Sequence, residues 1–426
     1  MRTLQLFVAL LSLLLAVHLF RVRHDVLFTT NRIQSSSSND YHQLRDHHQR
    51  MNEDSSGSKE AVLHIGPPKT GTTTIQYASD IFRKKLKEDG FDMPWVVAGV
   101  TKQKNTNGRY EVLNRNQVNL AMCFIQSKRK ELYICLKQLL TSGLEIANQN
   151  RNIFISTETF SRPDIDIHAL SEYLKPWEKI TVVVGYRRYY DWIMSAYNQN
   201  HKVKPGVDNL GLLSQKTSFY DFMLNDIEGV KAQETSHTYQ VIQRYKQYFN
   251  NIVVLNIHDT SKELVEAFYC DAMQNAQKMC EEVKELEVES KNLSKPLSYV
   301  ELLAAAHDAQ LIYLESNREV DVALEKIEEH QESTLGLSIH DFPMKCLPPN
   351  VLAELLEKSL KFEKEVVPEF FASPLGEAAL RSDFEEKSKG KMCSIDFEAT
   401  LKTVEWLDFF MSLRQELEQD RLNSFS

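Results

Sequence analysis

The residues best suited to chemistry lie in one short loop, residues 66–73, which reads Gly-Pro-Pro-Lys-Thr-Gly-Thr-Thr and follows the apolar run 61–65. The backbone N–H groups of such a loop, together with the N-terminus of the helix that follows, form a cradle for an anion. A lysine inside the loop supplies a cation, and threonine hydroxyls supply further donors. The loop therefore predicts a phosphate site, with the candidate residues Lys69, Thr70, Gly71, Thr72 and Thr73.

The loop differs from the nucleoside-triphosphate loop G-x-x-x-x-G-K-[ST]. In that pattern the lysine follows the second glycine, and the next hydroxyl binds magnesium. Gly66 and Gly71 keep the separation of the two glycines, but Thr72 stands at the lysine position and Lys69 lies inside the loop. This order disfavours ATP-dependent phosphoryl transfer, although a P-loop kinase remains an alternative.

The stretch from His64 to Thr73 resembles the 5′-phosphosulfate loop of sulfotransferases. The likeness is greatest to the Golgi carbohydrate branch and to bacterial relatives that read His-Ile-Gly-x-Pro-Lys-x-Gly-Thr-Thr. The resemblance implies a P-loop-like fold and the co-substrate 3′-phosphoadenosine 5′-phosphosulfate (PAPS), with no metal. It also implies that Lys69 reaches the oxygen that bridges phosphate and sulfate, while Thr72 and Thr73 donate to the remaining phosphate oxygens.

A second motif follows the apolar run 179–184. Sulfotransferases hold the 3′-phosphate of PAPS with an arginine at a strand end and a serine eight residues later, which by resemblance makes Arg187 and Ser195 cofactor-binding residues. A guanidinium suits a phosphate dianion because it donates in a planar fork. The commoner family text is Arg-Asp-Pro, whereas this chain reads Arg187-Arg188-Tyr189. The contact with phosphate therefore falls to either Arg187 or Arg188.

Sulfuryl transfer also needs a general base, because the acceptor must lose its proton as it attacks. The apolar run 152–155 is followed by Ser-Thr-Glu-Thr, which places Glu158 at the carboxyl edge of the predicted sheet, and we predict Glu158 as this base. Two alternatives stay open. In the first, the base is Glu88 or Asp89, since several Golgi sulfotransferases carry a catalytic glutamate about one helix after the lysine. In the second, Glu158 only orients a binding residue.

A looser resemblance to the Golgi branch lies at residues 267–294. Related enzymes close a short disulfide loop here and follow it with a basic loop over the cofactor. This implies a Cys270–Cys280 bridge and makes Lys291 and Ser294 candidate cofactor contacts. Residues 292–294 also form an N-glycosylation sequon, and because a glycan needs a solvated surface, the two roles exclude each other.

Short β-rich runs that alternate with helical stretches must position these motifs. The predicted strands are 61–65, 152–155, 179–184 and 251–255. Continuous apolar strands separated by helices predict an α/β fold with a parallel sheet flanked by helices, which binds ligands at the carboxyl ends of its strands. After about residue 297 the periodicity is helical, and no further strand is expected. This tail is predicted to pack on the core as a helical layer, with a separate helical subdomain as the alternative.

The N-terminus predicts attachment to a membrane. Residues 4–20 carry no charge, are flanked by arginines and are followed by no small-x-small cleavage site. We predict a signal-anchor at 1–23, a flexible, disordered stem at 24–60, a catalytic core at 61–296 and a helical extension at 297–426. The short span favours the Golgi membrane with a lumenal catalytic domain. One alternative is the membrane of the endoplasmic reticulum. The other is a cleaved signal peptide, after which the protein is secreted.

Composition limits the partners. The 426 residues carry a formal net charge of −9, which disfavours nucleic acid as a partner. Six cysteines fit an oxidising lumenal compartment. The leading hypothesis is sulfuryl transfer from PAPS to a hydroxyl or amine of a carbohydrate or glycoconjugate acceptor by in-line displacement. A P-loop kinase and a catalytically inactive, sulfotransferase-like binding protein are the alternatives.

Overall fold

The computed structural model describes residues 59–93, 120–125, 146–147, 149–201, 210, 213, 217–285, 297–331, 342–388 and 392–424. The predicted signal-anchor and all but the last two residues of the predicted stem lie outside these ranges, as do Lys291, Asn292 and Ser294. Within the described ranges, no helix has both the length and the apolar character needed to cross a membrane.

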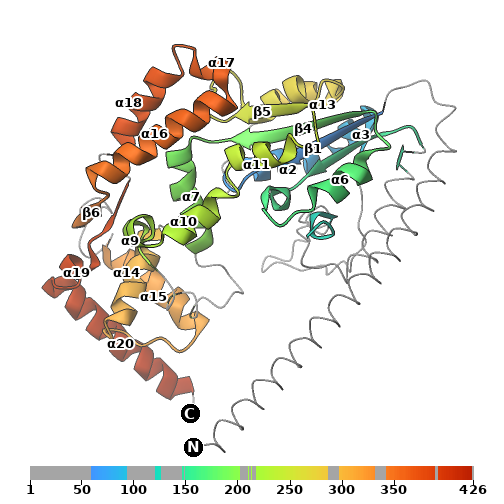
Figure 1. Cartoon of the computed structure of the whole chain (residues 1–426). Helices are drawn as coiled ribbons and strands as arrows, with labels where there is room; N and C mark the ends of the chain where they lie inside the picture. The colour runs from blue at the N-terminus through green and yellow to red at the C-terminus, as the bar shows by residue number, and fades with distance from the viewer. Residues whose placement is uncertain are drawn as a thin grey trace, which may run out of the picture. The chain divides into compact units, whose positions relative to one another are not determined.

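Five strands form one parallel sheet in the order β2-β3-β1-β4-β5. Figure 1 labels β1, β4 and β5 of this sheet. The five strands are β1 (Glu60–Ile65), β2 (Phe91–Asp92), β3 (Asn152–Ser156), β4 (Lys179–Tyr186) and β5 (Ile252–Asn256). Four of them match the predicted strands, because an apolar run that is buried on both faces leaves a clear pattern; every residue of β1 is buried. The two-residue β2 is too short to leave one.

Helices cover both faces of this sheet, as predicted. The helices between residues 59 and 285 are α2 (Thr72–Ile81), α3 (Arg83–Glu88), α6 (Ile167–Leu174), α7 (Tyr189–His201), α9 (Phe219–Asn225), α10 (Ile227–Glu234), α11 (Thr238–Tyr245), α12 (Leu264–Glu266), α13 (Gln277–Val283), the π-helix η3 (Ala267–Ala272) and the 3-10 turn η2 (Glu158–Ser161). Of these, α9 and α10 pack with α7 in a separate cluster away from the sheet. Successive strand residues face opposite sides. Leu63 and Ile65 of β1 pack with α6 and α11, whereas Val62 packs with α2, η3 and α13.

The C-terminal part is mainly helical, as predicted. Its helices are α14 (Leu297–Asp308), α15 (Asn317–Glu329), α16 (Pro349–Val366), α17 (Pro368–Phe371), α18 (Glu377–Ser388), α19 (Phe397–Thr400) and α20 (Val404–Ser424). α16 and α18 share a hydrophobic cluster with α7 of the sheet-containing part. α14, α15 and α20 form a further cluster of their own. The tail thus packs on the core through the apolar faces of α16 and α18 and has a small hydrophobic core between α14, α15 and α20.

The expectation of no strand after residue 297 is wrong. β6 (Met344–Cys346) and β7 (Cys393–Ile395) pair antiparallel. Each has three residues, so neither is long enough to show an alternating pattern. Their pairing joins segments far apart in the chain, and a disulfide between Cys346 and Cys393 links the two strands.

A second disulfide joins Cys270 in η3 to Cys280 in α13. The bridge expected from the family resemblance is therefore confirmed. The Cys346–Cys393 pair was not expected, because six cysteines allow fifteen pairings and no sequence feature selects one. The helix α12, which precedes this bridge, lies next to the predicted phosphate loop, since Leu264 packs against Gly71.

Candidate functional site

The predicted phosphate loop leaves the sheet at a topological switch point. β1 is central, and the chain adds β2 and β3 on one side of it and β4 and β5 on the other. At such a point the connections from two neighbouring strands diverge, and a crevice opens at their carboxyl ends. The motifs with Lys69 and Arg187 follow β1 and β4, so they lie at the edge of the sheet where such a crevice is expected.

The loop turns tightly before α2. Lys69 and Gly71 both adopt left-handed backbone conformations, with φ of 68° and 84°. The backbone N–H and the Oγ1 hydroxyl of Thr70 both donate to Pro67 O, over 3.2 and 2.7 Å. Trp192 in α7 anchors the loop from outside, because its Nε1 donates to Pro68 O over 3.0 Å. Thr70 is buried and its hydroxyl is engaged within the loop, so this predicted binding residue shapes the turn.

The first turn of α2 offers donors for an anion. Its N-cap is Gly71, which has no side chain to cap the helix, and the first N–H groups of a helix have no intrahelical partner. Thr72 is buried, and its Oγ1 has no hydrogen-bond partner among the described residues. A Cβ atom on Gly66 would lie 1.4 Å from that hydroxyl, so the glycine is required for the close approach. Thr73, the last predicted loop residue, is exposed.

Arg187 connects the loop to the second motif. Its Nη1 donates to Ser195 Oγ over 3.1 Å and lies 3.4 Å from Lys69 O. Its Nε is enclosed and has no partner among the residues the structure describes. The structure therefore brings Lys69, Arg187 and Ser195 together, although 118 residues separate Lys69 from Arg187.

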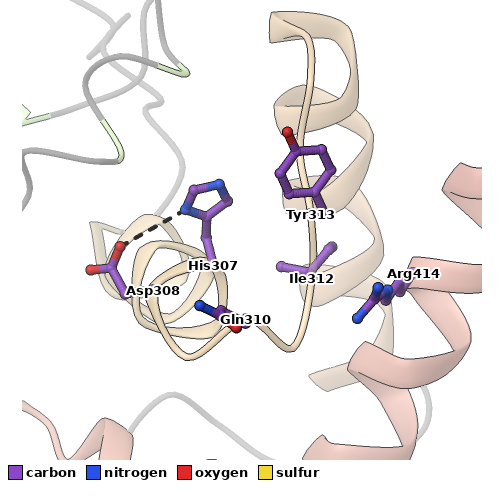
Figure 2. A pocket seen from close by; sticks show the side chains of 6 residues that line it. All are labelled: His307, Asp308, Gln310, Ile312, Tyr313 and Arg414. Atoms are coloured by element: carbon purple, nitrogen blue, oxygen red, sulfur yellow. Dashed lines mark ion pairs between the residues drawn. The ribbon is translucent and has the colours of Figure 1, made fainter.

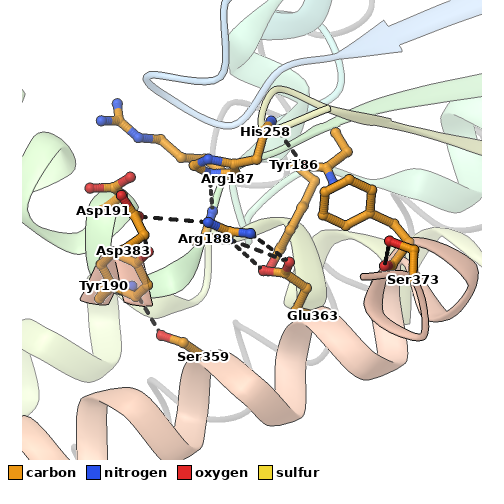
Figure 3. A network of polar contacts seen from close by, with 12 residues as sticks. Tyr186, Arg187, Arg188, Tyr190, Asp191, His258, Ser359, Glu363, Ser373 and Asp383 are labelled. Atoms are coloured by element: carbon orange, nitrogen blue, oxygen red, sulfur yellow. Dashed lines mark hydrogen bonds and ion pairs between the residues drawn. The ribbon is translucent and has the colours of Figure 1, made fainter. Parts of the chain in front are cut away.

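Arg188 serves a different part of the molecule. Its side chain is buried and pairs with Glu363 in α16, with 3.1 Å between Nε and Oε2, and lies 3.6 Å from Asp383 in α18 (Figure 3). Tyr186 also donates to Glu363, over 3.1 Å. Of the two consecutive arginines, Arg187 is the one whose side chain lies beside the loop, which favours it over Arg188 as the candidate phosphate contact.

Glu158 begins η2 at the carboxyl edge of the sheet, as predicted. The preceding residue, Thr157, donates its backbone N–H to His64 O over 3.2 Å, which holds this turn beside the end of β1. Glu158 is partly buried. The carboxylate therefore comes from a strand end adjacent to the one that carries the phosphate loop.

The alternative bases Glu88 and Asp89 lie at the opposite edge of the sheet. They precede β2, whose first residue pairs with the first residue of β3, so they lie at the amino ends of the strands. The Asp89 carboxylate accepts the backbone N–H groups of Lys278 and Met279, over 3.1 and 2.9 Å. The Asp89 carboxylate therefore caps α13. Because Glu88 and Asp89 lie at the edge of the sheet opposite the phosphate loop, their position favours Glu158 as the candidate base.

The buried His237 and the partly buried His258 hold the peptide group between the arginines, and no sequence motif indicates either. His237 Nε2 lies 3.2 Å from Arg187 O, and His258 Nε2 accepts the backbone N–H of Arg188 over 2.9 Å. The pKa of each imidazole is lowered to about 3, mainly by burial, and for His258 the neighbouring cations contribute to the lowering. Both rings are therefore neutral near pH 7.

A separate cavity of about 560 Å³ lies in the C-terminal helical part. Its lining comes from the end of α14, the turn that follows and α20, and comprises His307, Asp308, Gln310, Ile312, Tyr313 and Arg414 (Figure 2). None of the predicted site residues lines it. Comparison of the chain with models of known protein families and with curated proteins gives no match.

Proposed function

We propose that the protein is a PAPS-dependent sulfotransferase with a P-loop-like phosphate site, acting on a hydroxyl or amine of a carbohydrate or glycoconjugate. The observation that carries the proposal is the contact between two candidate anion-binding groups: the loop with Lys69 and the pair formed by Arg187 and Ser195. PAPS has two separate anionic groups, a 5′-phosphosulfate and a 3′-phosphate. A nucleoside triphosphate has only its 5′ chain.

Two buried hydrogen-bond donors without an acceptor among the described residues support PAPS as the ligand. Thr72 Oγ1 belongs to the loop and Arg187 Nε to the strand end, and both atoms are enclosed without partners among the described residues. Leaving a buried donor unsatisfied costs about 1–3 kcal/mol, so each site favours a bound acceptor. The loop would hold the 5′-phosphosulfate, and Arg187 with Ser195 would hold the 3′-phosphate.

The chain's own residues supply the remaining requirements. PAPS provides an activated sulfuryl group with adenosine 3′,5′-bisphosphate as its leaving group. Lys69 stabilises charge that develops on the bridging oxygen, as a preorganised donor does in a transition state. Glu158 accepts the proton of the attacking hydroxyl or amine. The predicted signal-anchor at 1–23 and a lumenal Golgi location belong to the same proposal, because they give access to glycoconjugate acceptors.

Transfer of labelled sulfate from PAPS to a panel of sugars, glycans and peptides tests the proposal. Lys69→Asn is the informative variant, because asparagine tolerates the left-handed backbone at this position. We expect its turnover to fall by about 10²- to 10³-fold with an unchanged melting temperature. Lys402→Ala, which alters an exposed lysine in an ion pair with Glu398, is the control and should remain active.

Three results would contradict the proposal. Normal transfer by a folded Lys69→Asn variant would remove the role of the loop. Transfer of phosphate from ATP with magnesium, in place of sulfate from PAPS, would identify a kinase. Binding of PAPS without turnover on any acceptor would instead indicate the inactive binding protein.

A further inference from the structure

We propose that His258, which follows β5, and Glu363, in α16, are positioning residues that hold Arg187 toward the phosphate loop. The inference rests on the proposed function, because Arg187 is there the residue that binds the 3′-phosphate. It adds to that site two residues from distant parts of the chain. It also makes the C-terminal helices a component of the nucleotide site.

The peptide group between Arg187 and Arg188 is held at both of its polar atoms. Its carbonyl oxygen lies 3.2 Å from His237 Nε2, and its N–H donates to His258 Nε2 over 2.9 Å. Rotation of this peptide would redirect the Arg187 side chain away from Ser195 and Lys69. The two hydrogen bonds oppose that rotation.

The two histidines must have opposite tautomers. His258 Nε2 accepts a hydrogen bond, so the proton of this neutral ring is on Nδ1. His237 Nδ1 accepts from the backbone N–H of Tyr239 over 3.4 Å, so its proton is on Nε2, which donates to Arg187 O. Protonation of His258 would abolish its acceptor. The nearby cations Arg188, Lys387 and Arg187 oppose such protonation, whereas the anion Asp383 favours it.

The side chain of Arg188 supplies the third restraint. Glu363 is fully buried and accepts from Arg188 Nε and Nη2, at 3.1 and 3.4 Å from its two oxygens, and from Tyr186 OH. This pair fixes residue 188 on the side of α16 (Figure 3). With residue 188 held there, residue 187 is left facing the crevice.

The test compares affinities for adenosine 3′,5′-bisphosphate and adenosine 5′-phosphate, measured by calorimetry on the full-length protein. The ratio of the two affinities isolates recognition of the 3′-phosphate. His258→Leu removes the acceptor and should reduce the ratio about tenfold or more, because small displacements of a binding group have large effects. In His258→Gln, the side-chain oxygen can accept the same N–H, so this variant should keep most of the ratio. Equal ratios in wild type and His258→Leu would overturn the role of His258.

Removal of Glu363 alone leaves a buried unpaired charge and risks unfolding, so both partners are replaced. Substituting a buried ion pair by apolar residues is often neutral for stability. The double variant Arg188→Met/Glu363→Leu should therefore fold, with the ratio reduced about tenfold or more. An unchanged ratio in the folded double variant would overturn the role of Glu363.

Glu319→Gln is the matched control, because Glu319 pairs with Arg421 at 2.7 Å between helices α15 and α20, away from the crevice. It should lower the melting temperature and leave the ratio unchanged. A lowered ratio in this control would show that general destabilisation explains the effect and would overturn the inference.

If the wild-type protein has no preference for the 3′-phosphorylated nucleotide, the proposed function itself fails. A wild-type preference that all variants keep refutes only the positioning role.

Discussion

Arg187 donates a hydrogen bond from Nη1 to Ser195 Oγ over 3.1 Å, and the same nitrogen lies 3.4 Å from the carbonyl oxygen of Lys69. One guanidinium thus links the end of β4, helix α7 and the loop after β1. The loop and the strand end belong to segments more than a hundred residues apart. Their contact turns two separate motifs into one candidate site.

Gly66→Ala should impair the loop sterically. Its Cβ would lie 1.4 Å from Thr72 Oγ1 and 2.6 Å from Thr72 Cβ, so Thr72 must move. We expect a loss of about 1–3 kcal/mol in the free energy of unfolding and at least tenfold weaker nucleotide binding. Gly90→Ala is the control, since Gly90 has φ of 86° but lies at the amino edge of the sheet. It should reduce stability by about 1–2 kcal/mol without affecting nucleotide affinity. Normal binding by Gly66→Ala would show that the Thr72 hydroxyl does not contribute.

Glu158→Gln separates two roles of this carboxylate. Glutamine keeps the shape and a hydrogen-bonding oxygen but lacks basicity, so a general base would lose about 10²- to 10⁴-fold in turnover at saturating PAPS. The affinity for adenosine 3′,5′-bisphosphate should hardly change. A weaker affinity with nearly normal saturated turnover would mean that Glu158 only orients a binding residue.

The two disulfides should contribute unequally to stability. In the loop-entropy model, the 10-residue separation of Cys270 and Cys280 corresponds to on the order of 3 kcal/mol, and the 47-residue separation of Cys346 and Cys393 to on the order of 4 kcal/mol. Urea unfolding of the paired serine variants should show both losses, the second larger. Peptide mapping without reduction should find each pair joined. Free thiols at these positions would contradict the assignment.

Stability should fall as the pH is lowered below about 6.5. His64, His237 and His258 have pKa values of about 3 in the folded protein because burial disfavours their charged forms. The unfolded chain, in which a histidine pKa is about 6.5, therefore binds more protons between pH 3 and 6.5. As the pH falls through this window, each histidine lowers the free energy of unfolding by up to about 1.4 kcal/mol per pH unit.

Urea unfolding between pH 7 and pH 5 measures this effect. In His258→Gln, the free energy of unfolding should depend less steeply on pH, because one of the three imidazoles is removed. The difference in slope should correspond to about one bound proton. A wild-type stability that stays constant between pH 7 and pH 5 would contradict the buried, neutral state of these rings.

The sheet is predictable because its strands are apolar along their whole length. β1, β3 and β4 are mostly buried on both faces, β5 is an apolar edge strand, and such runs differ clearly from the amphipathic helices between them. β2, β6 and β7 have two or three residues each, and their pairing depends on contacts between distant segments. Local sequence patterns hold no information on such contacts.

The candidate site is predictable to a similar extent. Lys69, Thr72 and Arg187 lie where their motifs indicate, at strand ends that a parallel sheet brings to one edge. The choice between Arg187 and Arg188 depends on Glu363, which is 175 residues from Arg188 in the chain. His258 carries no motif, because its role arises from a hydrogen bond to a backbone group.

The most direct test of the central claim is calorimetry of the purified full-length protein with adenosine 3′,5′-bisphosphate and with adenosine 5′-phosphate. We predict that the wild-type protein binds the 3′-phosphorylated nucleotide about ten- to a hundredfold more tightly, as hydrogen bonds to a charged group allow. Arg187→Ala should abolish this preference, whereas Arg381→Ala, which alters an exposed arginine in α18, should keep it. Equal affinity of the wild-type protein for the two nucleotides would contradict the account.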